Sequence, residues 1–341
     1  MNESAVIRLL YQGLPCEQGL APAAPFPAEA LARSPLRLLP DAEDASGWTE
    51  REEHGLRWLE RPAPGLPAPA YITGAASSSL DVAKALLKQG LFPEWSSVLC
   101  LSQSAGRGQM RRTWCSPEGN LYAALRLPNE GPFADTAAAP AIGGLLAEAL
   151  EGEGAPVMLK WPNDLLQGEK EGFLAPIPKK NACRKVGGIL LEERFGALVA
   201  GIGINTESAP EDSSLRDNYA FSAGIIRSAC GAPFFRAQAG NTKESQGFVS
   251  IFTLWKRLVE RLFSCYAYTT EPAPWWPALA EKHLAFRGCR AVLADACPEN
   301  EAMERVFCEG IVDGVTPTGA LRLRTEYGMD TFLGGSLLPG S

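Results

Sequence analysis

The sequence Lys160-Trp-Pro-Asn-Asp-Leu-Leu166 lies at the end of a short apolar stretch, residues 157–161, that is predicted to form a β-strand. It places a lysine, a tryptophan and an aspartate close together in the chain. Asn163 and Asp164 are residue types that open turns, so a plain turn is one interpretation. The other is a functional site, in which the Asp164 carboxylate lies near an attacking amine or a Mg²⁺ ion. The local sequence leaves both interpretations open.

A basic, glycine-containing stretch precedes this one: Gln103-Ser-Ala-Gly-Arg-Gly-Gln-Met-Arg-Arg112. Glycines on either side of Arg107 allow backbone amides to approach a ligand closely. The arginine offers a fixed fork of donors for a carboxylate or a phosphate. The alternative is an exposed basic turn that forms surface ion pairs.

Two glycine-containing strands follow, Lys185-Val-Gly-Gly-Ile-Leu190 and Gly201-Ile-Gly-Ile-Asn205. Glycine in a strand marks either close approach of a ligand or a packing constraint. The acids nearest to Lys185 in the sequence, Glu192 and Glu193, fall at the far end of the predicted strand. We therefore expect the Lys185 ammonium to lack a local partner and to await an anion, because an unpaired buried charge is costly.

The composition is that of a globular protein. The 341 residues are 46% hydrophobic and 21% charged, and the length suggests two domains. The net charge of −7 argues against a chain-wide basic surface for nucleic acid, and no helix-turn-helix pattern is found, so no specific DNA binding is expected. The longest nearly apolar run, residues 195–204, is too short to span a membrane. A cytoplasmic location is the default expectation.

The hydrophobic pattern predicts an α+β protein. Residues 1–70 are proline-rich and are predicted to be an extension with short elements near 4–11 and 50–60. Residues 71–286 are predicted to form a sheet domain, and residues 287–341 a compact β-barrel. Helices are expected at 79–88, 134–150, 248–266 and from about 277 to 286. Strands are expected at 97–101, 120–127, 157–161, 185–192, 197–204, 290–293, 305–312, 320–324 and 331–337.

The four motifs, taken together and in this order, resemble those of the biotin protein ligases over roughly residues 71–339. The resemblance implies a catalytic domain related to class II aminoacyl-tRNA synthetases and a C-terminal SH3-like barrel. It also implies the activity of this family: biotin is activated with ATP, in the presence of Mg²⁺, to biotinyl-5′-AMP. Biotin is then transferred to the ε-amino group of a lysine on a biotin carboxyl carrier protein, the biotin domain of a carboxylase.

The resemblance carries site roles over to individual residues. The positions implied for biotin or its adenylate are Ser78, Ser79, Gln103, Gly106, Arg107, Gly108, Gln109, Lys185 and Gly188. The positions implied for ATP are Arg107, Arg112, Asn163, Lys185 and Asn205. The positions implied for catalysis are Arg107, Lys160, Asp164 and Lys185, and Asp164 is also the implied Mg²⁺ ligand.

The implied mechanism agrees with elementary chemistry. A carboxylate is a poor electrophile, and adenylation gives it a good leaving group. Arg107, Lys185 and Mg²⁺ would offset the repulsion between biotin and ATP. Asp164 is the candidate to orient or deprotonate the incoming lysine.

The sequence also departs from the family pattern. Leu80 stands where the family commonly has asparagine, Gln109 and Met110 stand where basic residues or glycine are frequent, and residues 168–184 form a longer turn. Two alternatives therefore stay open, a lipoate-type ligase and a non-catalytic biotin-binding homologue. The sequence does not identify the acceptor carboxylase, and a homodimer is possible.

Overall fold

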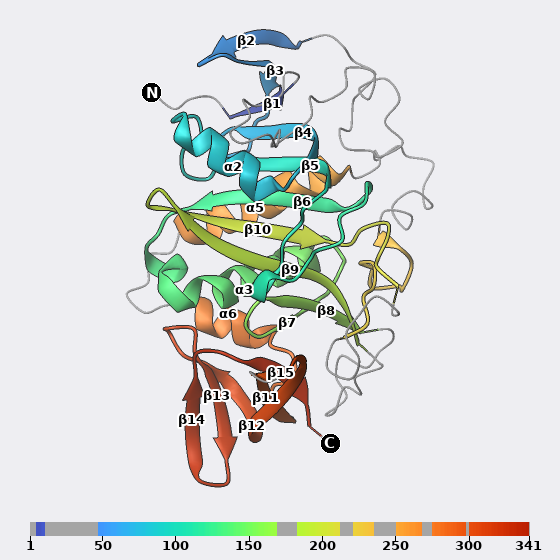
Figure 1. Cartoon of the computed structure of the whole chain (residues 1–341), viewed down its shortest axis with the longest axis vertical. Coiled ribbons are helices and arrows are strands. Elements are labelled where there is room, and N and C mark those ends of the chain that lie inside the picture. Colours follow the sequence, from blue (N-terminus) through green and yellow to red (C-terminus); the bar gives the residue numbers. More distant parts are fainter. Residues whose placement is uncertain are drawn as a thin grey trace. The chain divides into compact units, whose positions relative to one another are not determined.

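The computed structural model describes residues 5–10, 47–168, 183–211, 221–234, 250–267, 275–297 and 300–340 (Figure 1). The residues of the chain pack into two compact units. Unit 1 comprises Met1–Asn129, Ile189–Ser208 and Pro233–Ser264, and unit 2 comprises Glu130–Gly188, Ala209–Ala232 and Cys265–Ser341. The expected segment 168–184 lies almost entirely outside the described residues. In the described ranges, no helix combines the length and the apolar composition needed to cross a membrane.

Unit 1 is built on a mixed sheet. Its strands, in spatial order, are β2 (Thr49–Glu53), β3 (Leu56–Pro62), β1 (Val6–Leu10), β4 (Ala70–Ala76), β5 (Ser97–Gln103), β6 (Leu121–Leu127) and β10 (Ala197–Ile204). The strands β1, β4 and β5 run parallel to one another, and the other pairs are antiparallel. The strand β9 (Cys183–Arg194) is joined to β10 by a turn at Phe195 and Gly196.

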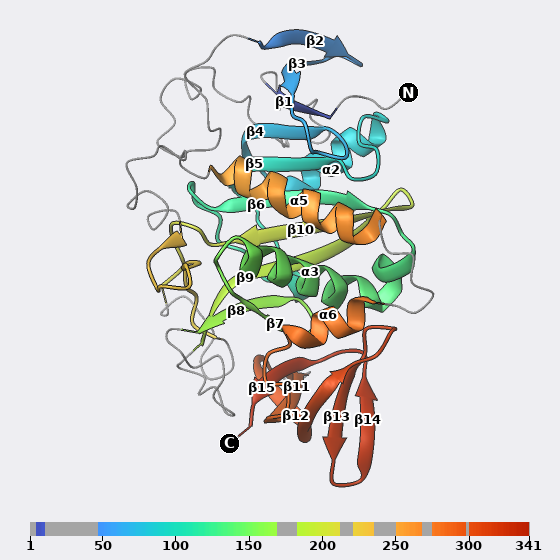
Figure 2. The same cartoon turned by 180° about the vertical axis from the view of Figure 1, so that it is seen from behind.

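Two helices cover opposite faces of this sheet, as a comparison of Figures 1 and 2 shows. The helix α2 (Ser79–Lys88) begins where predicted, because the Ser78 side chain caps its first turn by accepting from the Asp81 amide at 3.1 Å. The helix α5 (Ile251–Ala267) ends one residue beyond the helix expected up to residue 266 and buries an apolar stripe that includes Phe252 and Trp255. The expected start of this helix at residue 248 lies outside the described residues. The Trp255 indole donates to Ser97 Oγ at 3.0 Å and thereby links α5 to β5.

Unit 2 contains the strands β7 (Met158–Lys160) and β8 (Asp164–Gly168), residues 183–188 of β9, and the helices α3 (Ala138–Gly152) and α6 (Trp276–Lys282). The strand β8 pairs antiparallel with both β7 and β9. The helix α3 begins four residues later than predicted, because two 3₁₀ turns, Gly131–Phe133 and Asp135–Ala137, precede it. The strand β8 was not predicted.

The C-terminal part of unit 2 is a five-stranded antiparallel sheet. Its order is β14 (Gly328–Phe332), β13 (Leu321–Thr325), β12 (Asn300–Val315), β11 (Arg290–Cys297) and β15 (Ser336–Pro339). The prediction of one strand at 331–337 is wrong. Residues 333–335 form a bend, in which Gly335 has a φ of 119°, and this bend separates β14 from β15. The SH3-like barrel stays a prediction.

The N-terminal residues that the structure describes belong to the sheet of unit 1. The predicted short elements are the strands β1, β2 and β3, and β1 pairs in parallel with β4, which was also not predicted. The alternation of polar and apolar residues in β3 is short and is therefore only weak evidence for a strand. The domain boundaries at residues 70 and 286 stay predictions, because the boundaries of the two compact units fall at other residues.

Close packing between α3 and α6 generates a prediction. A Cβ built on Gly144 would lie 2.8 Å from Ala280 Cα and 3.1 Å from Ala280 Cβ. We expect Gly144→Ala to lower the free energy of unfolding by about 1–3 kcal/mol, since the two helix backbones must separate. Gly152→Ala is the matched control, because it lies in the last turn of the same helix with nothing within 4 Å. Urea unfolding of both variants checks this, and equal stabilities would contradict the packing.

Candidate functional site

The Gly-Arg-Gly motif lies in a loop that follows β5 in unit 1. Backbone hydrogen bonds close this loop, from the Gly108 amide to the Arg112 carbonyl at 2.7 Å and from the Trp114 amide to the Gly106 carbonyl at 2.9 Å. A Cβ on Gly106 would collide with the Trp114 carbonyl oxygen and lie 2.6 Å from Ser116 Oγ. The loop itself therefore requires glycine at position 106. Gly108 has more space, with the Arg112 carbonyl oxygen at 3.6 Å from such a Cβ.

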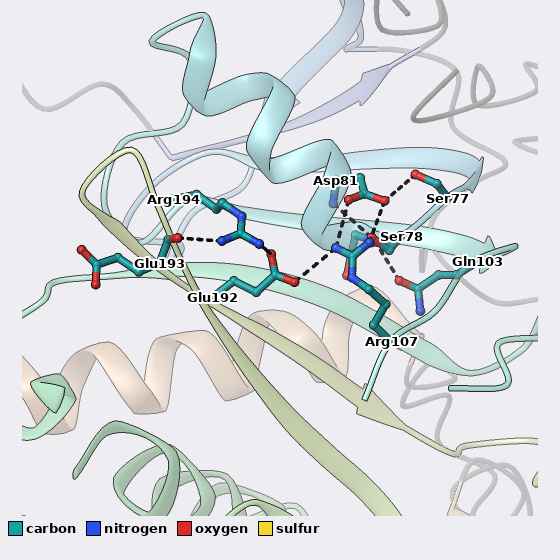
Figure 3. Close-up of polar contacts among 9 residues, drawn as sticks. Ser77, Ser78, Asp81, Gln103, Arg107, Glu192, Glu193 and Arg194 are labelled. Carbon is teal, nitrogen blue, oxygen red and sulfur yellow. Dashed lines mark hydrogen bonds and ion pairs between the residues drawn. The ribbon is translucent and has the colours of Figure 1, made fainter. Parts of the chain in front are cut away.

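Arg107 extends from this loop to two carboxylates (Figure 3). It donates to Asp81 through both terminal nitrogens, at 3.2 and 2.9 Å, and to Glu192 Oε1 at 3.3 Å. Burial opposes ionisation of Asp81, but hydrogen bonds from Arg107 and Ser77 outweigh it, so the pKa of this carboxyl lies below its usual value. The positive charge of Arg107 is thus balanced within the protein.

Ser78, Ser79 and Gln103, three of the residues implied for biotin or its adenylate, are adjacent in the structure. Gln103 Oε1 accepts from the Ser79 amide at 2.8 Å, and Gln103 Nε2 donates to Ser116 Oγ at 2.9 Å. Ser78 and Ser79 are both buried, and the Ser78 hydroxyl caps α2. Gln109 and Arg112, by contrast, are exposed on the same loop.

The fourth motif has a packing role in this structure. A Cβ on Gly201 would lie 2.9 Å from Leu80 Cδ1, and one on Gly203 would lie 2.8 Å from two ring atoms of Trp114. The two glycines of β10 therefore make room for Leu80 and for the Trp114 indole. This explains why Leu80 is tolerated, because its side chain packs over Gly201 and is buried.

Sequence reasoning missed Asn120, which fixes the turn after Asn205. Its side-chain oxygen accepts from the amides of Thr206, Glu207 and Ser208 at 2.9, 2.9 and 3.1 Å. Both asparagines are buried, with 3% of each residue exposed. In the sequence, Asn120 is only a polar residue at the start of an apolar strand. That position does not indicate that its partner is Thr206, 86 residues away.

In unit 2, Asp164 lies between two lysines. Its Oδ2 is 3.1 Å from Lys160 Nζ and its Oδ1 is 2.5 Å from Lys185 Nζ. Strand pairing brings these residues together: Asp164 faces Lys160 across β7–β8 and Gly188 across β8–β9. The expectation that Lys185 lacks a local partner is therefore wrong. The partner is a cross-strand neighbour on β8, which sequence proximity does not reveal.

The two ammonium groups determine the protonation state of Asp164. Burial alone would raise the pKa of the carboxyl, but Lys185 and Lys160 outweigh it and lower the pKa to about 2. A carboxylate with this pKa is a poor acceptor for a proton at neutral pH. The prediction that Asp164 deprotonates the incoming lysine is thus not supported by its surroundings.

The same geometry argues against a Mg²⁺ ion on Asp164. Both carboxylate oxygens already have a positive partner, and a divalent cation there would face two ammonium groups. The residues do not fit the metal at this position, and we derive no step through it.

The residues between Lys160 and Asp164 form the turn that joins β7 to β8, with a cis peptide bond between Trp161 and Pro162. Asn163 is buried in this turn. The Trp161 indole donates to the Gly319 carbonyl at 2.9 Å, and Lys160 Nζ lies 3.5 Å from Ser336 Oγ. Contacts with the strand β15 and with the turn before β13 therefore hold this turn in place.

A further group of possible metal ligands in the described residues consists of Glu148, Glu151 and His283. Lys282 Nζ lies 2.7 and 2.8 Å from the two glutamates, and His283 Nε2 lies 2.8 Å from Glu148. The hydrogen bond from Lys282, together with that from His283, lowers the pKa of Glu148. The lysine already pairs with both glutamates, and the cluster joins α6 to α3.

Comparison with known proteins finds similarity over part of the chain. Residues 76–207 match the model of the Biotin/lipoate A/B protein ligase family. This stretch contains all four motifs and both charged clusters. The chain is similar to this family of ligases over that stretch, which is less than half of its length.

Proteins that are similar to part of the chain include ligases from two bacteria. The chain is 34% identical over 128 residues to the bifunctional ligase/repressor BirA of Bacillus subtilis, which covers 35% of each chain. It is 36% identical over 124 residues to a biotin–[acetyl-CoA-carboxylase] ligase of Paracoccus denitrificans, which covers 33% of this chain and 45% of the relative. The chain thus spans less than half the length of these two relatives.

The fold is similar to that of a solved structure, a biotin protein ligase from Aquifex aeolicus in complex with biotin and ATP. The match has a TM-score of 0.53 at 21% identity and covers 80% of this chain and 98% of that one. At this identity the likeness concerns the fold.

The surroundings of Asp164 generate a prediction about acid stability. The folded-state pKa of about 2 lies below the ordinary value of 3.8, so the ionised carboxylate stabilises the fold above pH 4. This contribution, about 2 kcal/mol, is lost as the pH falls towards 2. We expect Asp164→Asn to be less stable than the wild type at pH 7 and the deficit to shrink by about half at pH 3. Urea unfolding at both pH values checks this, and a deficit independent of pH would contradict it.

Proposed function

We propose that this protein is a biotin protein ligase. It activates biotin with ATP to biotinyl-5′-AMP and transfers biotin to a lysine of a carboxylase's biotin carboxyl carrier protein. The observation that carries the proposal is the cluster of Lys160, Asp164 and Lys185 within the family's motifs. The names of the relatives support biotin as the substrate and a carboxylase domain as the acceptor.

The charge of this cluster suits the proposed chemistry. Two lysines and one aspartate leave one net positive charge, and Asp164 is less exposed than Lys185, at 15% against 31% of the side chain. An anionic ligand would therefore be attracted to the lysines, with Lys185 the more accessible of the two. Biotin brings a carboxylate, and adenylation places a phosphate next to it. Charge that develops on the phosphate oxygens would be stabilised by the same ammonium groups.

Asp164 takes a different role from the one expected of a base. Its ionised carboxylate holds the two ammonium groups in place before a ligand is bound. We propose that Asp164 orients the side chains of Lys160 and Lys185. The proton of the acceptor lysine then leaves by another route, and the Mg²⁺ requirement stays a prediction without Asp164 as the ligand.

The finer features remain part of this proposal. They are a catalytic domain related to class II aminoacyl-tRNA synthetases, an SH3-like C-terminal domain, a cytoplasmic location, a possible homodimer and no specific DNA binding. The family model also covers lipoate ligases, so lipoate is the principal alternative substrate. The non-catalytic biotin-binding homologue is the other alternative.

A single-turnover assay distinguishes these functions. The protein is incubated with Mg²⁺, radiolabelled ATP and either biotin or lipoate, and the acid-quenched mixture is analysed for the acyl-adenylate. We expect adenylate with biotin and little with lipoate. Adenylate with lipoate alone would establish the lipoate alternative, and biotin binding without any adenylate would establish the non-catalytic one.

The role of Lys185 yields a sharper prediction. Loss of one preorganised positive charge at the reacting anion slows chemistry by about 100-fold or more. We therefore expect Lys185→Gln to reduce the rate of biotinyl-adenylate formation by this factor at saturating biotin and ATP. Lys84→Gln, which removes an exposed lysine of α2, is the matched control and should leave the rate unchanged. A change of less than about threefold in Lys185→Gln would refute the assignment.

A further inference from the structure

Figure 3 shows Arg107 between two carboxylates that come from different elements of unit 1. Asp81 belongs to the first turn of α2, and Glu192 belongs to the end of β9. The Arg107 guanidinium contacts Asp81 at 2.9 Å and Glu192 at 3.3 Å. The second oxygen of Glu192 lies 3.0 Å from Arg194. The four side chains thus form a continuous chain of ion pairs.

The charges of this chain cancel, because it contains two arginines and two acids. This distinguishes it from the lysine cluster, which carries a net positive charge. The two carboxylates are less exposed than Arg107, at 29% and 16% of their side chains against 36%. Breaking the contacts would therefore leave partly buried acids without their main cation, which favours the paired state.

The contacts hold the loop at its tip. At its base, the loop is fastened to α2 by the hydrogen bond between Gln103 and the Ser79 amide. At its tip, the neighbouring residues Gln109 and Met110 are exposed, and Arg107 supplies the ion pairs that reach α2 and β9. Two contacts on different elements restrict the loop more than one, because both must break before the tip can move away.

We propose that Glu192, together with Asp81, is a positioning residue that clamps the Gly106–Gly108 loop through Arg107, and that this clamp slows the escape of the acyl-adenylate. The clamp itself stands on the ion pairs, whereas its effect on the adenylate rests on the proposed function. A loop that stays closed also limits access of water to a reactive mixed anhydride. In this account Glu192 acts on the reaction only through Arg107.

The first arm of the test needs no ligand. Hydrogen–deuterium exchange is measured for peptides covering residues 104–114 in the wild type, Glu192→Gln and Glu193→Gln. Glu193 is the matched control, because its carboxylate points away from Arg107 in Figure 3 and the substitution removes the same charge one residue away. We expect about threefold faster exchange in Glu192→Gln only, in line with the loss of one partly exposed ion pair. Equal exchange in all three proteins would overturn the clamp.

The second arm measures the release of preformed biotinyl-adenylate after dilution into excess unlabelled biotin and ATP. We expect release to be about threefold faster in Glu192→Gln and unchanged in Glu193→Gln. In an Arg107→Ala background, Glu192→Gln should have no further effect, since its route of action is already absent. An undiminished effect in that background would show that Glu192 does not act through Arg107.

The two arms separate the clamp from the proposed function. If the wild type forms no adenylate, the proposed function fails, but the exchange measurement still tests the clamp. Thermal unfolding checks that each variant is folded. Should Glu192→Gln fail to fold, Glu192→Asp replaces it, because it keeps the charge but shortens the side chain that spans the contact. Faster exchange in Glu192→Asp than in Glu193→Gln supports the clamp, and equal exchange overturns it.

Discussion

The proposed chemistry depends on one interaction, the Asp164 carboxylate held between the ammonium groups of Lys160 and Lys185. The pairing of β7, β8 and β9 brings these three side chains together. The turn between β7 and β8 is held by hydrogen bonds from Trp161 and Lys160 to Gly319 and Ser336. The aspartate offsets the repulsion between the two ammonium groups when no ligand is bound. The remaining net positive charge attracts an anion to this site. The same partnership lowers the pKa of Asp164 and gives both of its oxygens a positive partner, which argues against the roles of base and metal ligand.

The two charged clusters differ in a way that separates binding from positioning. The lysine cluster has an excess of positive charge, whereas the chain of Asp81, Arg107, Glu192 and Arg194 is balanced. A balanced chain gives an anion little reason to displace a carboxylate, so its contribution is mechanical. The glycines of the motifs also have structural roles. A side chain at Gly106, Gly201 or Gly203 would contact the Trp114 carbonyl, Leu80 or the Trp114 ring, respectively.

Much of the fold could be predicted from local patterns, because the signals were local. The helix α2, the helix α5 and the strands β5, β6, β9 and β10 all appear at or near their predicted positions. The strand β8 and the partner of Lys185 could not be predicted, since both depend on which strands pair across the sheet. The order of the four motifs indicated a resemblance to one family, but residue types alone did not reveal that Arg107 and Lys185 are each paired with an acid of the protein itself.

The central claim, that the excess positive charge of the lysine cluster attracts the carboxylate of the substrate, is tested most directly by calorimetric titration with biotin and with biotinamide, which lacks that charge. The account predicts that the wild type binds biotin about tenfold more tightly than the amide, and that Lys160→Gln/Lys185→Gln loses this preference. Equal affinity of the wild type for the acid and the amide would contradict it.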